Sequence, residues 1–164
     1  CNNISKKLNF NNLSFIYGDV IDYENKDEID MVISLHACNT ATDIAILKAL
    51  GWNAKVFFAV PCCQKEINSQ LGNEFLPFML KHGIIKEKFS TLLTDSIRSE
   101  VLEAFCYKSD IVEFISEENT PKNQLIRAYK TSTKLDKEKI KQIKKFTSSL
   151  NIKMFLLDEV AKLI

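Results

Sequence analysis

Polar and nucleophilic side chains follow two short apolar runs at the point where each run ends. His36-Ala37-Cys38 comes directly after residues 31–35, and Pro61-Cys62-Cys63-Gln64 comes directly after residues 56–60. Histidine transfers protons near neutral pH, and a cysteine thiolate is both a nucleophile and a metal ligand. Because ligands of open α/β sheets bind outside the carboxyl ends of the strands, this pattern predicts a reaction site at two neighbouring strand ends.

The cysteines and His36 admit other interpretations. If the strand ends are buried in a core, the cysteines are small residues that fill space, and His36 is a core histidine whose ring nitrogens are hydrogen-bonded. His36, Cys38, Cys62 and Cys63 also form a four-ligand set for zinc. Neighbours in an extended segment point to opposite sides, so we do not expect Cys62 and Cys63 to hold one ion. The signature of zinc deaminases is also incomplete, because Cys38 stands in place of its Glu and Lys65 in place of its second Cys. We therefore predict no metal site.

Composition narrows the class of protein. The chain has 164 residues, 46% of them hydrophobic, with a formal net charge of +1, which is typical of one globular domain. The four glycines are too far apart for a P-loop or a dinucleotide-binding turn. The five cysteines are odd in number and unevenly spaced, which argues against a disulfide framework and favours the cytoplasm. No apolar run approaches the roughly 18 residues of a membrane span.

The apolar runs at 31–35 and 56–60 read as strands buried on both faces of a parallel sheet, and the helical spacing between them predicts a βαβ unit. The short connection 116–123 predicts a hairpin, so the last strand runs antiparallel. The remaining pattern predicts strands at 13–17, 110–115 and 124–129 and helices at 74–81, 86–105 and 136–164.

Charge is uneven along the chain. Residues 122–145 contain nine basic and two acidic side chains, a net charge of +7. A basic segment after the last strand favours an anionic partner, and we predict RNA.

Several blocks of the sequence, in the same order, resemble a family of S-adenosylmethionine-dependent class I methyltransferase domains. The resemblance runs from Asn12 to about Lys130, and Asn39 departs from it because that place usually holds Asp. With its charge lost, Asn39 remains a fair helix cap. The blocks are Leu35-His36-Ala37-Cys38-Asn39-Thr40-Ala41-Thr42-Asp43, Val60-Pro61-Cys62-Cys63-Gln64, Thr94-Asp95 with Arg98, Glu113-Phe114, and Thr120-Pro121-Lys122-Asn123.

The resemblance implies an α/β fold with a truncated Rossmann-like methyltransferase sheet. Such domains begin with a strand, a glycine-rich turn and a second strand, none of which the printed sequence contains, so we expect a fragment holding the third to seventh strands of the order 3-2-1-4-5-7-6. Residues 1–133 would form the C-terminal portion of the domain, with a helical segment, 134–164, packed on it. The strand 31–35 would have a free edge. We expect 13–17 to pair there, or two copies to associate through it.

The resemblance also implies roles around S-adenosylmethionine. Asp19 would accept from the adenine amino group, Val20 would pack on the ring, and Leu35 and His36 would face the methionine and its methyl group, with His36 as catalytic base. The substrate contacts implied are Cys38, Asp43, Pro61, Gln64, Lys122 and Asn123.

Cys62 and Cys63 are alternative catalytic residues, because pyrimidine C5 methyltransferases use a Cys nucleophile and some contain Pro-Cys-Gln. The predicted function is methyl transfer, with RNA as the favoured acceptor, then protein, then a small molecule. The alternative is a nonenzymatic binding or regulatory module that retains the methyltransferase fold.

Overall fold

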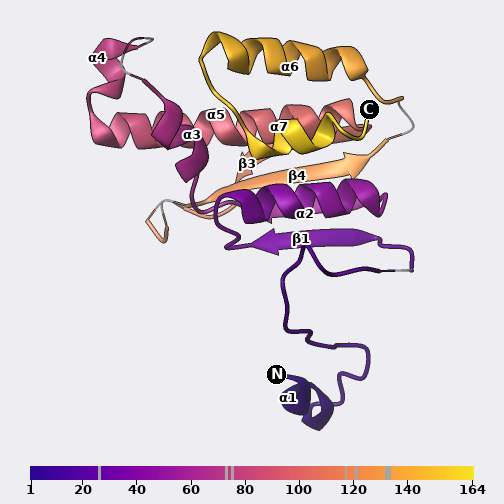
Figure 1. The fold of residues 1–164 in the computed structure, drawn as a ribbon. Coiled ribbons are helices and arrows are strands. Elements are labelled where there is room, and N and C mark those ends of the chain that lie inside the picture. Colours follow the sequence, from indigo (N-terminus) through magenta and orange to yellow (C-terminus); the bar gives the residue numbers. More distant parts are fainter. Residues whose placement is uncertain (26, 73, 75, 117, 121, 132–133) are drawn as a thin grey trace.

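A computed structural model describes the chain except for residues 26, 73, 75, 117, 121, 132 and 133 (Figure 1). Its four strands form one sheet in the order β1-β2-β4-β3. The elements are α1 (Asn2–Lys7), β1 (Met31–Leu35), α2 (Thr40–Gly51), β2 (Val56–Val60), α3 (Lys65–Gln70), α4 (Pro77–Leu80), α5 (Gly83–Ala104), β3 (Tyr107–Glu113), β4 (Gln124–Lys130), α6 (Lys137–Ser149) and α7 (Phe155–Val160).

The sheet confirms the predicted βαβ unit and hairpin. β1 and β2 are parallel, with Met31 opposite Val56 and Leu35 opposite Val60, and α2 connects them. β4 is antiparallel to both β2 and β3. The carboxyl ends of β1 and β2 are therefore neighbours at one edge of the sheet, which is the arrangement that the predicted site requires.

The hydrophobic core lies on one face of this sheet, under the helices. Phe57 of β2, Ala128 of β4 and Tyr107 of β3 are buried on that face. The Tyr107 hydroxyl donates to the Ala54 carbonyl at 2.6 Å, and burial raises the pKa of Tyr107 to about 12. α5 and α2 pack on the strands, α6 packs on α5, and α7 packs on α2. The C-terminal helices thus close the same core.

The opposite face of the sheet is open among the described residues. Met31, Ile33 and Leu35 are 46%, 57% and 61% exposed, and β1 pairs only with β2 in the described part of the chain. The prediction that β1 is buried on both faces is therefore wrong for this structure, because no described helix packs on that side. The uninterrupted apolar run still indicates a strand, but not what covers it.

Residues 1–30 form an arm that leaves the body of the fold at β1 (Figure 1). The predicted strand at 13–17 is wrong, and so is its pairing with β1. Side chains of α1 take the backbone groups that a sheet would use: the Asn2 amide both donates to and accepts from the Phe15 backbone, at 2.8 and 2.7 Å. Ser5 Oγ donates to the carbonyls of Phe10 and Leu13. Association of two copies through β1 stays a prediction.

The short helices differ most from the prediction. Within the helix expected at 74–81, the described helical residues are those of α4, and residue 75 lies outside the described residues; α3 was not predicted. The long α5, read from apolar residues at steps of four, matches its predicted range closely. Among the described residues, none of the helices combines the length and apolar content that crossing a membrane requires.

Candidate active site

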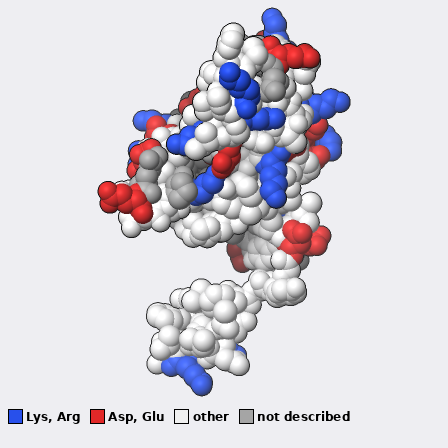
Figure 2. All heavy atoms as spheres, turned by 90° about the vertical axis from the view of Figure 1, so that its left-hand side faces the viewer, with Lys and Arg blue, Asp and Glu red and all other residues white. Residues whose placement is uncertain are grey.

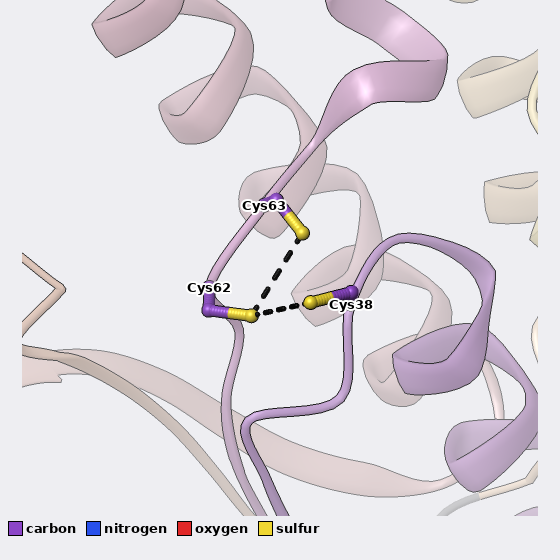
Figure 3. Close-up of side chains that lie close together, drawn as sticks. All are labelled: Cys38, Cys62 and Cys63. Carbon is purple, nitrogen blue, oxygen red and sulfur yellow. Dashed lines mark hydrogen bonds between the residues drawn. The ribbon is translucent and has the colours of Figure 1, made fainter.

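The structure brings the two predicted strand-end segments together. Cys38 Sγ lies 3.0 Å from Cys62 Sγ, and the Asn39 backbone N–H donates to the Cys63 carbonyl at 3.2 Å (Figure 3). The expectation that residues 36–38 and 61–64 lie side by side is therefore confirmed. The thiols are not core fillers, because Cys38 is exposed and Cys62 and Cys63 are half-buried.

The loop from β1 to α2 is held in an unusual backbone conformation. His36 and Asn39 have φ values of 55° and 52°, and the ψ of Asn39 is −121°, a region that residues with side chains rarely occupy. Such a conformation costs on the order of 1–3 kcal/mol and persists where its surroundings fix it. Asn39 is fixed at its backbone N–H, at its carbonyl and at its side-chain oxygen. The loop is thus rigidly placed.

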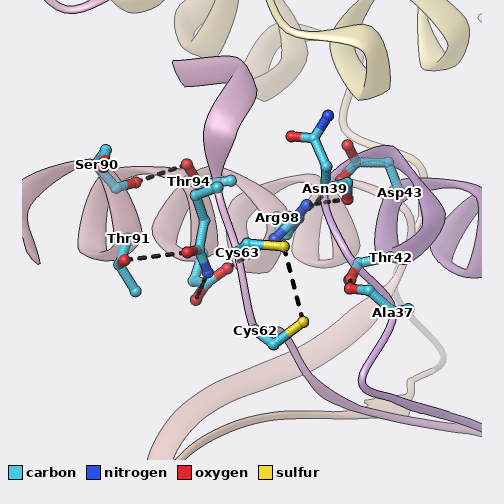
Figure 4. A network of polar contacts seen from close by, with 12 residues as sticks. Ala37, Asn39, Thr42, Asp43, Cys62, Cys63, Ser90, Thr91, Thr94 and Arg98 are labelled. Atoms are coloured by element: carbon cyan, nitrogen blue, oxygen red, sulfur yellow. Dashed lines mark hydrogen bonds and ion pairs between the residues drawn. The ribbon is translucent and has the colours of Figure 1, made fainter. Parts of the chain in front are cut away.

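A buried arginine, Arg98, holds the loop between β1 and α2 at the Asn39 carbonyl. Arg98 of α5 is 1% exposed and donates to Asp43 Oδ1 at 2.7 Å, to Asp95 Oδ1 at 2.9 Å and to the Asn39 carbonyl at 2.9 Å (Figure 4). Asp43 and Asp95 are equally buried. A buried ion pair needs additional hydrogen bonds to offset desolvation, and here one of them, from Arg98 to the Asn39 carbonyl, ends on the loop between β1 and α2.

One cation serves two carboxylates in this network. Burial raises the pKa of Asp43 and of Asp95, and the charge and hydrogen bonds of Arg98 offset only part of that rise. Burial also opposes the charge on Arg98, but the two carboxylates together raise its pKa, so the guanidinium stays charged. Asp43 Oδ2 is buried without a hydrogen-bond partner among the described residues. Loss of Arg98 would leave both carboxylates uncompensated.

The same network reaches the end of β2 through Gln64. The Gln64 amide donates to Asp95 Oδ2 at 3.3 Å, and its oxygen accepts from Thr91 Oγ1 at 3.0 Å. On the other strand end, Thr42 Oγ1 donates to the Ala37 carbonyl at 2.7 Å. Both loops are therefore tied, through buried side chains, to α5 or to the start of α2.

The sequence suggested that the Asn39 side chain caps α2, but in the structure it does not. Asn39 is the N-cap residue of α2, but its Oδ1 accepts from the Glu66 N–H, in the first turn of α3, at 3.0 Å. The Glu66 carboxylate in turn accepts from the Phe155 N–H, at the start of α7, at 2.8 Å. Two helix N-termini are thus capped by side chains from other elements.

The Glu66 cap gives a pH-dependent prediction. Burial raises the pKa of Glu66 above its ordinary 4.5, aided by the charge of Asp43 and opposed by the Phe155 hydrogen bond and the Arg98 charge. Between the ordinary and the raised value, the folded chain keeps a proton that the unfolded chain has lost. The stability of the wild type relative to Glu66→Gln therefore falls as pH rises through that window and is constant above it.

Thermal unfolding of both proteins across a pH series measures this difference. We expect Glu66→Gln to be at least as stable as the wild type at neutral pH and to lose that advantage below pH 4.5, the ordinary value for Glu66. If the difference in melting temperature between the wild type and Glu66→Gln does not change with pH, the Glu66 carboxyl has the same pKa in the folded and the unfolded chain.

A cavity of about 310 Å³ adjoins the strand ends, and Cys62, Cys63, Gln64 and Lys122 contribute to its wall. Lys122 also pairs with Glu87 of α5 at 3.1 Å. Asn123 is buried and donates to the Ile115 carbonyl, which holds the β3–β4 connection. Four of the predicted site residues thus share one cavity.

Other predicted site residues lie elsewhere. Asp43, which was expected to contact substrate, has no exposed surface in this structure and pairs with Arg98. His36 and Leu35 are exposed at the end of β1, and Pro61 is buried at the end of β2. Pro121 of the Thr120–Asn123 block lies outside the described residues.

Asp19 and Val20 are on the arm, and their described hydrogen bonds are local. Asp19 Oδ1 accepts from the Ile21 N–H at 3.1 Å, and the Val20 carbonyl accepts from the Tyr23 N–H. The arm meets the body at its C-terminal end: Tyr23 and Glu24 contact Lys48 and Trp52, in and just after the last turn of α2, and Asp30 pairs with Lys55 and accepts from the Val56 N–H. Asp19 and Val20 are therefore not joined to the strand ends by any described hydrogen bond or ion pair.

The basic residues of 122–145 spread over β4, α6 and the loops. Several pair with acids: Arg127 with Asp110, Lys139 with Glu100 and Glu103, and Lys141 with Glu138. On the face in Figure 2, basic and acidic side chains are interspersed. The net charge of the segment is thus partly neutralised by its neighbours.

Part of the chain is similar to a known family of domains. Residues 1–70 match the family model of a methyltransferase domain. No curated protein and no solved structure matches the chain. The matched region contains β1, α2 and β2, so the part of the chain that carries both strand ends is similar to a methyltransferase domain.

Proposed function

We propose that this chain serves S-adenosylmethionine-dependent methyl transfer, with the loops after β1 and β2 forming the acceptor side of the reaction site. The convergence of Cys38 and Cys62, within a region that matches a methyltransferase domain, carries the proposal. The strand order β1-β2-β4-β3 supports it, because the last four strands of the order that the resemblance implies, 4-5-7-6, are arranged in the same way.

The described residues fit one part of a cofactor site. When bound, S-adenosylmethionine supplies an electrophilic methyl group. Leu35 and His36 are exposed at the end of β1, where the resemblance places the methionine portion. Asp19 and Val20 do not complete that site in this structure, because their described contacts stay within the arm.

Because the fit is partial, we predict that the 164-residue chain alone binds S-adenosylmethionine weakly or not at all. The glycine-rich turn that grips the amino acid portion does not occur in its sequence. Calorimetry on the purified chain measures the affinity directly. Micromolar binding would mean that the cofactor site lies somewhere other than the end of β1.

The chain's own residues have distinct tasks in the proposed reaction. His36 stands exposed at the strand end, free of the buried network, and would take a proton from an acceptor that must lose one. Cys62, Gln64 and Lys122 line the cavity in which the acceptor would sit. Arg98 acts through Asn39 and is a positioning residue. Alignment of the acceptor with the methyl carbon is the main contribution of such a rigid site.

RNA is the acceptor that we propose. The basic segment 122–145 supports this choice, because Lys122 lies at the cavity and further lysines follow on α6. The test is transfer of labelled methyl groups by the complete natural protein to total RNA, protein and small-molecule fractions. Label in RNA is expected. Label in protein or small molecules alone would overturn the acceptor, and no transfer at all would favour the nonenzymatic module.

Covalent pyrimidine methylation is a second candidate, favoured by the position of Cys62 and Cys63 in the cavity wall. A thiolate that attacks pyrimidine C6 forms a stable adduct with 5-fluoropyrimidine RNA. An adduct that is lost in Cys62→Ser or Cys63→Ser would establish this chemistry. Activity that survives both substitutions would leave direct transfer to nitrogen or oxygen.

A further inference from the structure

Three thiols converge at the strand ends. The Sγ atoms of Cys38, Cys62 and Cys63 all lie within 4.8 Å of one another, with 3.0 Å between Cys38 and Cys62 and 3.8 Å between Cys62 and Cys63 (Figure 3). The expectation that the adjacent cysteines point to opposite sides is therefore wrong. The chain bends at this point from β2 into α3, so Cys62 and Cys63 are not part of a regular strand.

We propose that Cys38, Cys62 and Cys63 are the ligands of a binding site for a thiophilic divalent metal ion, and that this ion is Zn²⁺. Zinc binds thiolates at about 2.3 Å in tetrahedral geometry, which separates neighbouring sulfurs by about 3.8 Å. The Cys62–Cys63 distance of 3.8 Å already has this value, and the Cys38–Cys62 distance of 3.0 Å would have to open by about 0.8 Å.

Hydrogen bonds fix the backbone on both sides of Cys38 and at Cys63. Cys38 lies between Ala37, whose carbonyl accepts from Thr42, and Asn39, whose carbonyl accepts from Arg98. Cys63 is tied to the same loop through its carbonyl. The donor atoms are therefore placed before an ion arrives, which reduces the ordering cost of binding.

Exposure of the thiols fits a metal site with an open position. Cys38 is exposed, and Cys62 and Cys63 line the 310 Å³ cavity, so an ion could enter from solvent. Three protein ligands leave the fourth tetrahedral position for water or for a substrate atom, as in catalytic zinc sites. Lys65, Lys122 and Glu87 line the same cavity, and since Lys122 pairs with Glu87, Lys65 is the cation that favours the negative charge of the filled site.

Binding involves no redox change. Each of the three S–H groups loses its proton to the buffer, and three Zn–S bonds replace bonds from zinc to water. The filled site has a net charge of −1. Because this chemistry needs neither S-adenosylmethionine nor an acceptor, the inference does not rest on the proposed function.

The experiment titrates Zn²⁺ into the full, chelator-treated chain under a phosphine reductant. We expect about one bound ion per chain, and Co²⁺ in its place should give the near-ultraviolet charge-transfer absorption of cobalt thiolates. Cys38→Ser and Cys62→Ser should each weaken binding by about tenfold or more, since loss of outer partners alone costs 10- to 100-fold. Cys1→Ser is the matched control, because Cys1 is exposed on the arm and should not affect binding.

Three results would overturn the metal site. One is a fully reduced, folded chain that retains no zinc. A second is zinc bound with equal affinity in Cys38→Ser, which would place the ion elsewhere. A third is a Cys38–Cys62 disulfide in the protein isolated from cells, with no zinc bound after reduction, which would make the cluster a redox pair. Cys38→Ser also separates this site from the covalent candidate, which uses Cys62 or Cys63. Zinc binding without methyl transfer would contradict the proposed function alone.

Discussion

Arg98→Met should lower the free energy of unfolding by about 3–5 kcal/mol, the usual cost of removing one partner from a buried ion pair. Arg98 is fully buried and is the hydrogen-bonding partner of both Asp43 and Asp95, so its loss leaves two carboxylates without their cation. For a chain of this size the melting temperature should fall by roughly 10 °C. The Asn39 loop also loses the donor to its carbonyl.

Two further variants make this prediction specific. Arg127→Met is the matched control, because Arg127 pairs with Asp110 at 3.6 Å with both side chains over 40% exposed, and it should cost less than about 1 kcal/mol. Adding Asp43→Asn and Asp95→Asn to Arg98→Met should restore part of the stability, because no uncompensated charge remains. If Arg98→Met costs no more than Arg127→Met, the buried network does not hold the strand ends.

His36→Asn should reduce methyl transfer at saturating substrates by about 10²-fold or more, the contribution of a general base. Asn tolerates the positive φ of His36, 55°, better than Ala, so this variant removes the imidazole with little added backbone strain. His36→Ala should show the same loss with some destabilisation. The measurement is initial-rate kinetics of the complete protein, with melting temperatures of each variant.

Asp19→Ala and His82→Ala separate this role from others. If Asp19 accepts from the adenine, Asp19→Ala should raise the KM for S-adenosylmethionine while turnover stays near that of the wild type. His82, the other histidine, precedes α5, and His82→Ala should leave both KM and turnover unchanged. Turnover that survives in His36→Asn would leave His36 a residue of the loop and not the base.

The sequence alone predicts the elements that position the site. Residues 31–35 and 56–60 are short, apolar and rich in β-branched or aromatic side chains, and the helical spacing between them leaves a parallel βαβ unit as the simple solution. Adjacency of the two strand ends follows from that topology. The family match covers the same region, which supports the resemblance read from its motifs.

Side-chain contacts were the part that the sequence could not supply. Arg98 and Asp95 belong to a resemblance block, but their pairing with Asp43 depends on how α5 crosses the start of α2. A signal existed: charged residues three apart, beside the apolar stripe of Phe89 and Val101, in a helix expected to face the core. The sequence also did not predict that the Cys62 and Cys63 side chains converge. Side chains alternate between the two faces within a strand, but these residues lie beyond the end of β2.

The arm shows the limit of local pattern. Residues 13–17 have a strand-like composition, yet a strand forms only where a partner accepts its hydrogen bonds, and here Asn2 and Ser5 accept or donate them instead. Tyr17 is consequently fully exposed.

We propose that methyl transfer takes place at the adjoining ends of β1 and β2. The most direct measurement is a structure of the complete protein with S-adenosylhomocysteine and an acceptor fragment bound. We expect the homocysteine sulfur to lie against Leu35 and His36 and the acceptor to enter the cavity lined by Cys62 and Lys122. A ligand bound at the opposite end of the strands, away from His36 and Cys62, would contradict it.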